Sequence, residues 1–297
     1  MAIRGTMMAI RIHAPGLDGL RYEAIETPSL RSGEALVEVH AAAITRGELE
    51  WSLDRLPAVP SYELSGVVAA VAEDVTTAAA GDEVFALTPF DRDGVAAEYA
   101  AVPAAALAPK PAMLSHVESA AVPLPALSAW QGLFVHGDLE AGERVLVLGA
   151  VGGVGQFATQ LARWSGAYTV AAASPDAFDA ARALGAHEVV DGRGGLGEVG
   201  PVDLVFDTVG GESLERAAAV VGSGGRLVSI AEAPPGEGTY FVVEPNREQL
   251  AELARLMDAR QVRVGIDSTF PLSEAAAGFE RSLASGKHGK VVFRVAG

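Results

Sequence analysis

The stretch from Val145 to Gly155 constrains the fold more than any other part of the chain. Four apolar residues, Val145–Leu148, are typical of a buried strand, and a glycine-rich turn follows at once. After Gly155, apolar residues recur at helix spacing. A strand, a glycine turn and a helix in this order place a dinucleotide pyrophosphate at the N-terminus of the helix. A glycine turn of an α/β domain that binds no ligand is the alternative.

Short β-rich runs alternate with helical patterns after this loop. Each run is apolar and has glycine or acidic residues near its ends. This alternation predicts a parallel, doubly wound sheet. The expected strands are 168–173, 189–191, 202–207 and 225–230, and the expected helices are 175–185 and 211–221.

The composition excludes several classes of protein. None of the 297 residues is cysteine, which excludes disulfides, thiolate zinc sites and a cysteine nucleophile, and favours the cytoplasm. The net charge of −16 argues against a nucleic-acid surface. No apolar run is long enough for a membrane span and no apolar leader is present, so we expect neither membrane insertion nor secretion. The Arg- and Ala-rich composition, with three lysines, suggests a GC-rich bacterial genome.

The region from residue 9 to 125 has a different pattern from the middle of the chain. Short alternating segments separated by Gly, Pro and Asp predict a small, mostly antiparallel β-domain. Pro123 and Pro125 mark the end of this domain, and an amphipathic helix is expected over 247–259. Residues 1–7 are left out of the expected fold, because Met1-Ala-Ile-Arg is repeated as Met8-Ala-Ile-Arg and suggests an alternative start.

Seven short segments carry a family pattern, and their order and spacing are more specific than any one of them. They are Leu64-Ser-Gly-Val-Val, Gly81-Asp-Glu-Val-Phe, Ala120-Ala-Val-Pro-Leu-Pro-Ala-Leu-Ser-Ala-Trp130, the Gly149–Gly155 loop, Ala183-Leu-Gly-Ala186, Phe206-Asp-Thr-Val-Gly-Gly211 and Gly289-Lys-Val-Val292. From about Met8 to Val295 the chain resembles the medium-chain dehydrogenase/reductase superfamily. Within it, the chain looks like the zinc-independent quinone oxidoreductase and enoyl reductase branch.

The resemblance implies an α/β protein with a chaperonin-10-like (GroES-like) β-barrel catalytic domain, a doubly wound Rossmann domain and a cofactor cleft between the two. The catalytic domain would be discontinuous, with residues 8–125 and 263–297, and the dinucleotide-binding domain would span residues 126–262. The family also implies a homodimer, formed by edge strands of the Rossmann sheet near 226–243.

The departures from the zinc enzymes of this superfamily are as informative as the matches. Thr45 and Tyr62 fall on the two positions where those relatives carry a Cys and a His ligand, and the four-cysteine structural zinc lobe is absent. A catalytic zinc therefore lacks its expected ligands, and no metal site is predicted.

The same two residues are the catalytic candidates that the resemblance implies. Tyr62 would donate to the substrate oxygen, and Thr45 would face the nicotinamide; a core tyrosine and a buried strand-end threonine are the alternatives. Arg46 and Trp51 are candidates for the substrate pocket. For Arg46 an ion pair with Glu48 or Glu50 is the favoured alternative, and for Trp51 a place in the core. Glu63 is expected to be structural, and Lys290 has a place in the family pattern but reads equally well as a surface lysine.

The cofactor candidates lie around the strand ends of the expected parallel sheet. Ser174 follows a strand that lacks the acidic residue typical of NAD enzymes, and Arg193 could supply a charge for a 2′-phosphate. Asp176 nearby would favour NADH instead, so NADPH is the preferred cofactor and NADH remains open. The full set implied by the resemblance is Ser128, Ala150, Gly152, Gly153, Val154, Ser174, Arg193, Val209, Ile230, Phe241 and Val242.

These residues predict an NADPH-dependent oxidoreductase that transfers a hydride to a small quinone or to an α,β-unsaturated carbonyl compound without zinc. Two other functions are alternatives for this sequence. One is an NADPH-binding protein of the same fold without turnover, and the other is an alcohol dehydrogenase, which would require bound zinc.

Overall fold

The computed structural model describes residues 4–51, 53–284, 286 and 288–295, and the chain folds into two compact units. Unit 1 comprises the residues up to Leu124, Pro245–Ala259 and the residues from Gly265 on. Unit 2 comprises Pro125–Glu244 and Arg260–Val264. The first division lies within one residue of the expected boundary, where the two prolines interrupt the chain.

Helix α6 (Arg247–Asp258) groups with unit 1, whereas the sequence analysis placed its residues in the dinucleotide-binding domain. The helix contacts strand β7 (Ala108–Pro109). Its two ends are bonded to the same unit, because Arg247 donates to the carbonyl of Thr77 and the Met113 N–H donates to Asp258. An amphipathic pattern shows which face of a helix is buried but does not show against which neighbour.

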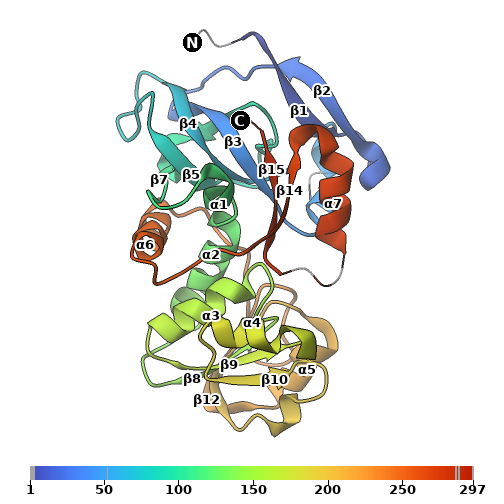
Figure 1. Cartoon of the computed structure of the whole chain (residues 1–297), viewed down its shortest axis with the longest axis vertical. Coiled ribbons are helices and arrows are strands. Elements are labelled where there is room, and N and C mark those ends of the chain that lie inside the picture. The colour runs from blue at the N-terminus through green and yellow to red at the C-terminus, as the bar shows by residue number, and fades with distance from the viewer. Residues whose placement is uncertain (1–3, 52, 285, 287, 296–297) are drawn as a thin grey trace. The chain divides into compact units, whose positions relative to one another are not determined.

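Unit 2 contains a parallel sheet, as the sequence predicted, and Figure 1 labels β8, β9, β10 and β12 of it. The sheet has six strands in the order β10-β9-β8-β11-β12-β13, of which β13 was not predicted. Its central strands are buried on both faces, which is why their sequences are nearly continuous apolar runs. The strands are β8 (Arg144–Leu148), β9 (Tyr168–Ala173), β10 (Glu188–Asp191), β11 (Val202–Asp207), β12 (Val221–Ser229) and β13 (Thr239–Tyr240).

The helices of unit 2 follow the expected alternation with the strands. They are α3 (Gly155–Trp164), α4 (Phe178–Ala183) and α5 (Gly211–Ala218). Helix α2 (Pro123–Trp130) leads into this unit and continues as a π-helix over Gln131–His136. Of the residues that the structure describes, no helix is long and apolar enough to cross a membrane.

Unit 1 contains the predicted, mostly antiparallel β-domain, and the C-terminal segment returns to it. The last strand, β15, pairs antiparallel with β3, so residues from both ends of the chain share one seven-stranded sheet. The sheet is formed by β3 (Glu34–Ile44), β4 (Glu63–Val71), β5 (Glu83–Leu87), β6 (Tyr99–Pro103), β7, β14 (Ile266–Pro271) and β15 (Lys290–Arg294), and the helices beside it are α1 (His116–Ala120), α6 and α7 (Ala275–Leu283).

The exclusion of residues 1–7 from the fold was wrong for the last two of them. Strand β1 (Thr6–Ile12) pairs with β2 (Leu20–Glu26) over its whole length, and Met7 is buried. The repeated tetrapeptide was a misleading signal, because strand pairing with β2 begins before the second methionine of the repeat.

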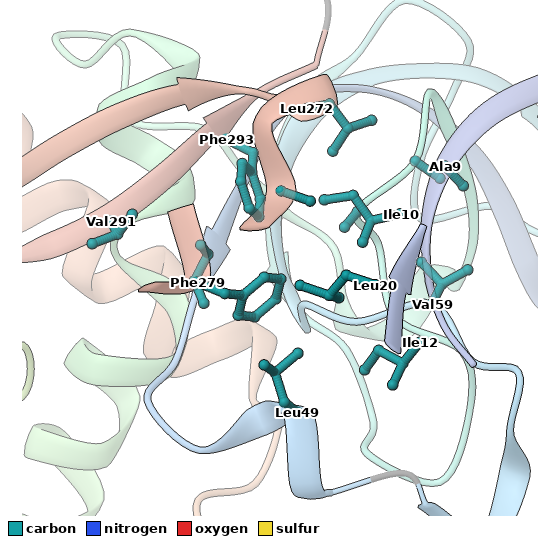
Figure 2. Close-up of a cluster of buried hydrophobic side chains, with 14 of the residues drawn as sticks. Ala9, Ile10, Ile12, Leu20, Leu49, Val59, Leu272, Phe279, Val291 and Phe293 are labelled. Atoms are coloured by element: carbon teal, nitrogen blue, oxygen red, sulfur yellow. The ribbon is translucent and has the colours of Figure 1, made fainter. Parts of the chain in front are cut away.

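A buried apolar cluster anchors the part of unit 1 that carries the candidate site. Figure 2 shows Leu49, Phe279, Val291 and Phe293 in this cluster, together with residues from β1 and β2. Leu49 directly follows Glu48, and Val291 directly follows Lys290. Side chains alternate between the two faces of a strand, so burying Val291 in this cluster directs Lys290 to the opposite face of β15.

Candidate active site

The glycine loop of unit 2 has the geometry that a pyrophosphate requires. Gly149 has a φ of 70°, which favours glycine, and a Cβ on Gly155 would lie 2.0 Å from the carbonyl oxygen of Gly149. Of the residues that the structure describes, none accepts a hydrogen bond from the N–H groups of Gly153 or Val154, and helix α3 begins at Gly155. Unbonded amides at a helix N-terminus fit phosphate oxygens.

Ser174 and Arg193 lie at the carboxyl ends of two neighbouring strands. Ala173 of β9 is the register partner of Asp191 of β10, and each candidate residue follows one of these strand ends. The Gly192 N–H donates to the carbonyl of Ala173 at 3.0 Å and holds the two ends together. Arg193 is exposed. The structure therefore brings together the two residues that the sequence analysis assigned to a 2′-phosphate.

A buried carboxylate that the sequence analysis missed organises the next two strand ends. Asp207, at the end of β11, accepts hydrogen bonds from the N–H groups of Val209 (2.9 Å) and Gly210 (3.0 Å). Its other oxygen accepts a 2.6 Å bond from the hydroxyl of Ser229, at the end of β12. The Ile230 N–H donates to the Asp207 carbonyl at 3.1 Å. One buried residue thus fixes the positions of both Val209 and Ile230.

The segment with Phe241 and Val242 is also held in place by a residue that the sequence analysis did not select. Gln131 of the π-helix donates to the Glu244 carbonyl at 2.8 Å and accepts from the Glu244 N–H at 3.0 Å. The Phe241 N–H donates to Ser229, and its ring lies against that of His136, while the side chain of Val242 is exposed. The acid of the Phe-Asp-Thr-Val-Gly-Gly segment was a sequence signal for Asp207, whereas no pattern marked Gln131.

Ser128 is buried in the sixth position of α2, so the alternative of a helix N-terminal serine does not describe it. Ala150 is also buried, and its N–H donates to the carbonyl of Ala172 at 3.1 Å. This bond joins the start of the glycine loop to β9.

In unit 1, Thr45 and Tyr62 lie at adjoining strand ends, as the ligand positions of the zinc relatives would. Thr45 follows the end of β3 and Tyr62 precedes the start of β4, and Ala43 and Glu63 are register partners there. Ser61, just before Tyr62, is buried and has a φ of 66°. A non-glycine residue in this conformation is strained, and such residues concentrate at functional sites.

Lys290 is buried at this place and not on the surface, with 6% of the residue exposed. Its ammonium group donates to Glu63 Oε1 at 2.5 Å and to Thr45 Oγ1 at 3.0 Å. Thr45 Oγ1 donates to the same Glu63 oxygen at 3.2 Å, and the Leu124 N–H donates to Glu63 Oε2 at 2.9 Å. Glu63 therefore has a structural role, as predicted, and is the only ion-pair partner of Lys290 in the described part of the chain.

Glu48 is the second carboxyl group of this cluster, and 2% of it is exposed. Burial raises the pKa of Glu48 well above its usual range, and the negative charge of Glu63 raises it further, while Lys290 acts in the opposite direction. The expected ion pair between Glu48 or Glu50 and Arg46 was wrong, because Arg46 is exposed and pairs with no acid in the described residues. The side chain of Glu48 packs inward, since Leu49 beside it is anchored in the core.

An aromatic group surrounds Tyr62. Its ring centroid lies 5.1 Å from that of Phe90 and 6.1 Å from that of Trp51, and the Arg55 guanidinium donates to its hydroxyl at 3.5 Å. Tyr62 is buried, whereas 43% of Trp51 is exposed. The alternative of a core tryptophan was therefore wrong, because a large part of Trp51 is exposed.

The residues present do not fit a catalytic zinc. In the part of the chain that the structure describes, no three His, Cys, Asp or Glu side chains come together to hold a metal ion. The two ligand positions carry Thr45 and Tyr62, and an ammonium group lies against Thr45.

Comparisons with known proteins agree with this geometry. A family model described as an alcohol dehydrogenase GroES-like domain matches residues 31–112, and one described as a zinc-binding dehydrogenase matches residues 184–293. The chain is 32% identical to an NADPH-dependent alkenal/one oxidoreductase of Arabidopsis thaliana, over 93% of this chain and 76% of the relative. It is 34% identical to a 2-methylene-furan-3-one reductase of Solanum lycopersicum, over 91% of this chain and 75% of the relative.

A solved structure of a quinone oxidoreductase from Coxiella burnetii has the same fold. It matches 98% of this chain and 100% of its own with a TM-score of 0.92 and 27% sequence identity. This match and the two family models confirm the expected combination of a chaperonin-10-like β-domain and a doubly wound domain.

Proposed function

Because the chain belongs to the medium-chain dehydrogenase/reductase superfamily, we propose that it reduces conjugated carbonyl compounds, enones or quinones, with NADPH and without zinc. The observation that carries the proposal is the cluster of Thr45, Glu63 and Lys290, which puts a hydroxyl group and an ammonium group where a metal would need ligands. The relatives named as alkenal/one, furanone and quinone reductases support the same substrate class.

NADPH would supply the hydride. The protein then has to bind the cofactor, orient the substrate and stabilise the charge that develops on the substrate. The amides of Gly153 and Val154 would bind the pyrophosphate, and Gly152, whose N–H donates to the Gly149 carbonyl, would let the backbone approach it. Ser174 and Arg193 would bind the 2′-phosphate. The segments fixed by Asp207 and Gln131 would hold the nicotinamide end through Val209, Ile230, Phe241 and Val242, together with Ser128 and Ala150.

The substrate oxygen gains negative charge during the reaction, and a fixed donor must stabilise that charge. Thr45 is the first candidate donor, because the residue is partly exposed. Tyr62 is the second candidate, reached once a ligand displaces the aromatic contacts around it. Trp51 would stack on a planar substrate, and the exposed Arg46 would bind a substrate carboxylate.

The test begins with binding. NADPH and NADH are titrated separately while tryptophan emission is followed, and the purified protein is then assayed with NADPH and either cyclohexenone or 1,4-benzoquinone. Tight binding of NADPH and turnover of either acceptor support the proposal. Binding of NADPH without turnover would favour the non-catalytic role, and a preference for NADH would make Asp176 the determinant of the ribose site.

Metal analysis of the same preparation tests the zinc-independent part. Stoichiometric zinc, together with oxidation of simple alcohols that a chelator abolishes, would replace the proposal with an alcohol dehydrogenase. Full activity after dialysis against the chelator supports it.

The proposal includes a homodimer in the cytoplasm of a bacterial cell. The short edge strand β13 supports the dimer, since Tyr240 in this strand exposes a large aromatic side chain. Sedimentation velocity of the wild-type chain tests the dimer, and a monomer at micromolar concentration would contradict it.

A further inference from the structure

The proposed function uses Lys290 only as a group that a zinc ion would not tolerate, and gives it no part in the reaction itself. Lys290 is one of three ionisable side chains buried beneath the partly exposed Thr45, and the other two are Glu48 and Glu63. A buried ammonium group is costly unless it is paired, and burial leaves its field weakly screened. A lysine at this place therefore acts on whatever binds at the Thr45 hydroxyl.

The two carboxyl groups of this cluster differ in their hydrogen bonds. Glu63 is fully bonded, because its two oxygens accept hydrogen bonds from Lys290, from Thr45 and from the Leu124 N–H. Burial raises the pKa of Glu48, which favours the neutral form of this carboxyl group, and its Oε1 has no hydrogen-bond partner in the described residues. Glu63 is therefore the acid to which Lys290 is hydrogen-bonded.

The hydrogen bonds fix the direction in which Thr45 can donate. Lys290 donates to Thr45 Oγ1 at 3.0 Å, so the hydroxyl hydrogen has to point to another acceptor. That acceptor is Glu63 Oε1 at 3.2 Å, an oxygen that already receives the shorter 2.5 Å bond from Lys290. If the hydroxyl turns toward a ligand, Glu63 keeps both its Lys290 bond and its Leu124 bond.

We propose that Lys290 is a positioning residue that makes Thr45 the donor to the carbonyl oxygen of an α,β-unsaturated ketone, aldehyde or thioester. This inference rests on the proposed function and makes its substrate class more specific. It names enones, in preference to quinones, as the substrates that the cluster of Thr45, Glu63 and Lys290 serves. The ammonium group polarises the Thr45 hydroxyl and orients its hydrogen toward the substrate.

The reaction at the substrate balances as follows. The β-carbon gains a C–H bond from the hydride of NADPH, which leaves as NADP⁺, and the two electrons of the carbon–carbon double bond shift toward the carbonyl oxygen. The resulting enolate oxygen accepts the hydrogen bond of Thr45, and the α-carbon then takes a proton from water. Only the oxygen charge depends on Lys290.

Comparing two acceptors separates this role from a structural one. Reduction of a quinone forms an aromatic ring, and that gain drives hydride transfer with little help from a donor at oxygen. We expect Lys290→Met to lower kcat for cyclohexenone by about 100-fold, as the loss of an oxyanion donor does, and to change kcat for 1,4-benzoquinone by less than about 5-fold. KM for both acceptors and the NADPH dissociation constant should stay within about 3-fold.

Lys110→Met is the matched control, since Lys110 is the other lysine that the structure describes, and its side chain is 7% exposed. Lys110 pairs with Glu83 and donates to two carbonyl groups, away from Thr45. This variant should leave both activities unchanged. Equal losses on the two acceptors in Lys290→Met would show a structural defect and overturn the inference.

Thr45→Val completes a double-mutant cycle with Lys290→Met. If Lys290 acts through Thr45, the additional loss of enone activity on replacing Lys290 should vanish in the Thr45→Val background. Additive losses would overturn the inference. If Lys290→Met alone fails to fold, the variant Glu63→Gln/Lys290→Met removes both buried charges and takes its place in the cycle. A wild-type protein inactive with both acceptors would overturn the proposed function, whereas wild-type activity with unselective variants overturns only the role of Lys290.

Discussion

The two candidate sites of this chain are built from different parts of the polypeptide. In unit 2 the ligand would meet backbone amides, and side chains such as Asp207 and Gln131 act on the backbone from behind. In unit 1 the chemistry belongs to side chains, with Thr45, Glu63 and Lys290 bonded to one another. A backbone site depends on space and loop shape, whereas a side-chain site depends on charge, so the two should fail under different substitutions.

The largest expected effect is on NADPH binding at the backbone site of unit 2. It comes from adding a methyl group, with no functional group removed. A methyl group on Gly155 would meet the Gly149 carbonyl at 2.0 Å, and the loop would have to move. Gly155→Ala should raise the NADPH dissociation constant about 100-fold, because several phosphate contacts are lost together. Fluorescence titration measures it. The control is Gly197→Ala of the same unit, where a Cβ meets open space. Equal affinities of the two variants for NADPH would refute the glycine loop as the pyrophosphate site.

A smaller effect is expected when the support behind the backbone is removed. Asp207→Ala leaves the N–H groups of Val209 and Gly210 without their acceptor, so the free energy of unfolding should fall by about 2–3 kcal/mol. The NADPH dissociation constant should rise about 20-fold as the two strand ends loosen. Asp203→Ala removes an exposed acid of the same strand that accepts one hydrogen bond, from the Arg144 N–H. This variant should lose at most about 1 kcal/mol and keep the wild-type affinity for NADPH. An unchanged affinity of Asp207→Ala for NADPH would mean that Asp207 contributes to stability and not to cofactor binding.

Unit 1 should instead respond to pH. Because the folded pKa of Glu48 is raised, the folded state retains a proton that the unfolded chain releases, so stability falls as pH rises from the unfolded pKa toward the folded one. One proton gives a slope of at most about 1.4 kcal/mol per pH unit. Glu48→Gln should remove this slope and be more stable than wild type at pH 8. Urea unfolding between pH 5 and 8 measures it, and the exposed neighbour Glu50→Gln should keep the wild-type slope.

The smallest effect is expected where a side chain of unit 2 is exposed. Arg193→Ser should weaken NADPH about 3–5-fold and leave NADH unchanged, because an exposed ionic contact contributes little. Paired titrations with the two cofactors measure it. Arg182→Ser, an exposed arginine of α4 with its own partner Asp179, is the control. If Arg193→Ser lost affinity for NADPH and NADH equally, Arg193 would not be a 2′-phosphate ligand.

The difference between the backbone site of unit 2 and the side-chain site of unit 1 also explains which features could be predicted from the sequence. Strands 168–173 and 202–207 were predicted to the residue, because parallel strands buried on both faces are apolar along their length. The glycine loop was readable from spacing alone. The cluster in unit 1 was not, since Thr45 and Lys290 are 245 residues apart and no local pattern records their contact. Trp51 and the pairing of Arg46 were misjudged for the same reason, because exposure depends on neighbours distant in sequence.

The position of Lys290 in the last strand has a consequence for the making of the protein. A ribosome has to synthesise more than 240 residues after β3 before β15 emerges and pairs with it. All six strands of the unit 2 sheet precede it, so a nascent chain can acquire its nucleotide-binding half early. The ammonium group that neutralises Glu63 arrives last, so a prematurely terminated translation product would carry an unpaired buried carboxylate, and proteases could distinguish it from the finished enzyme.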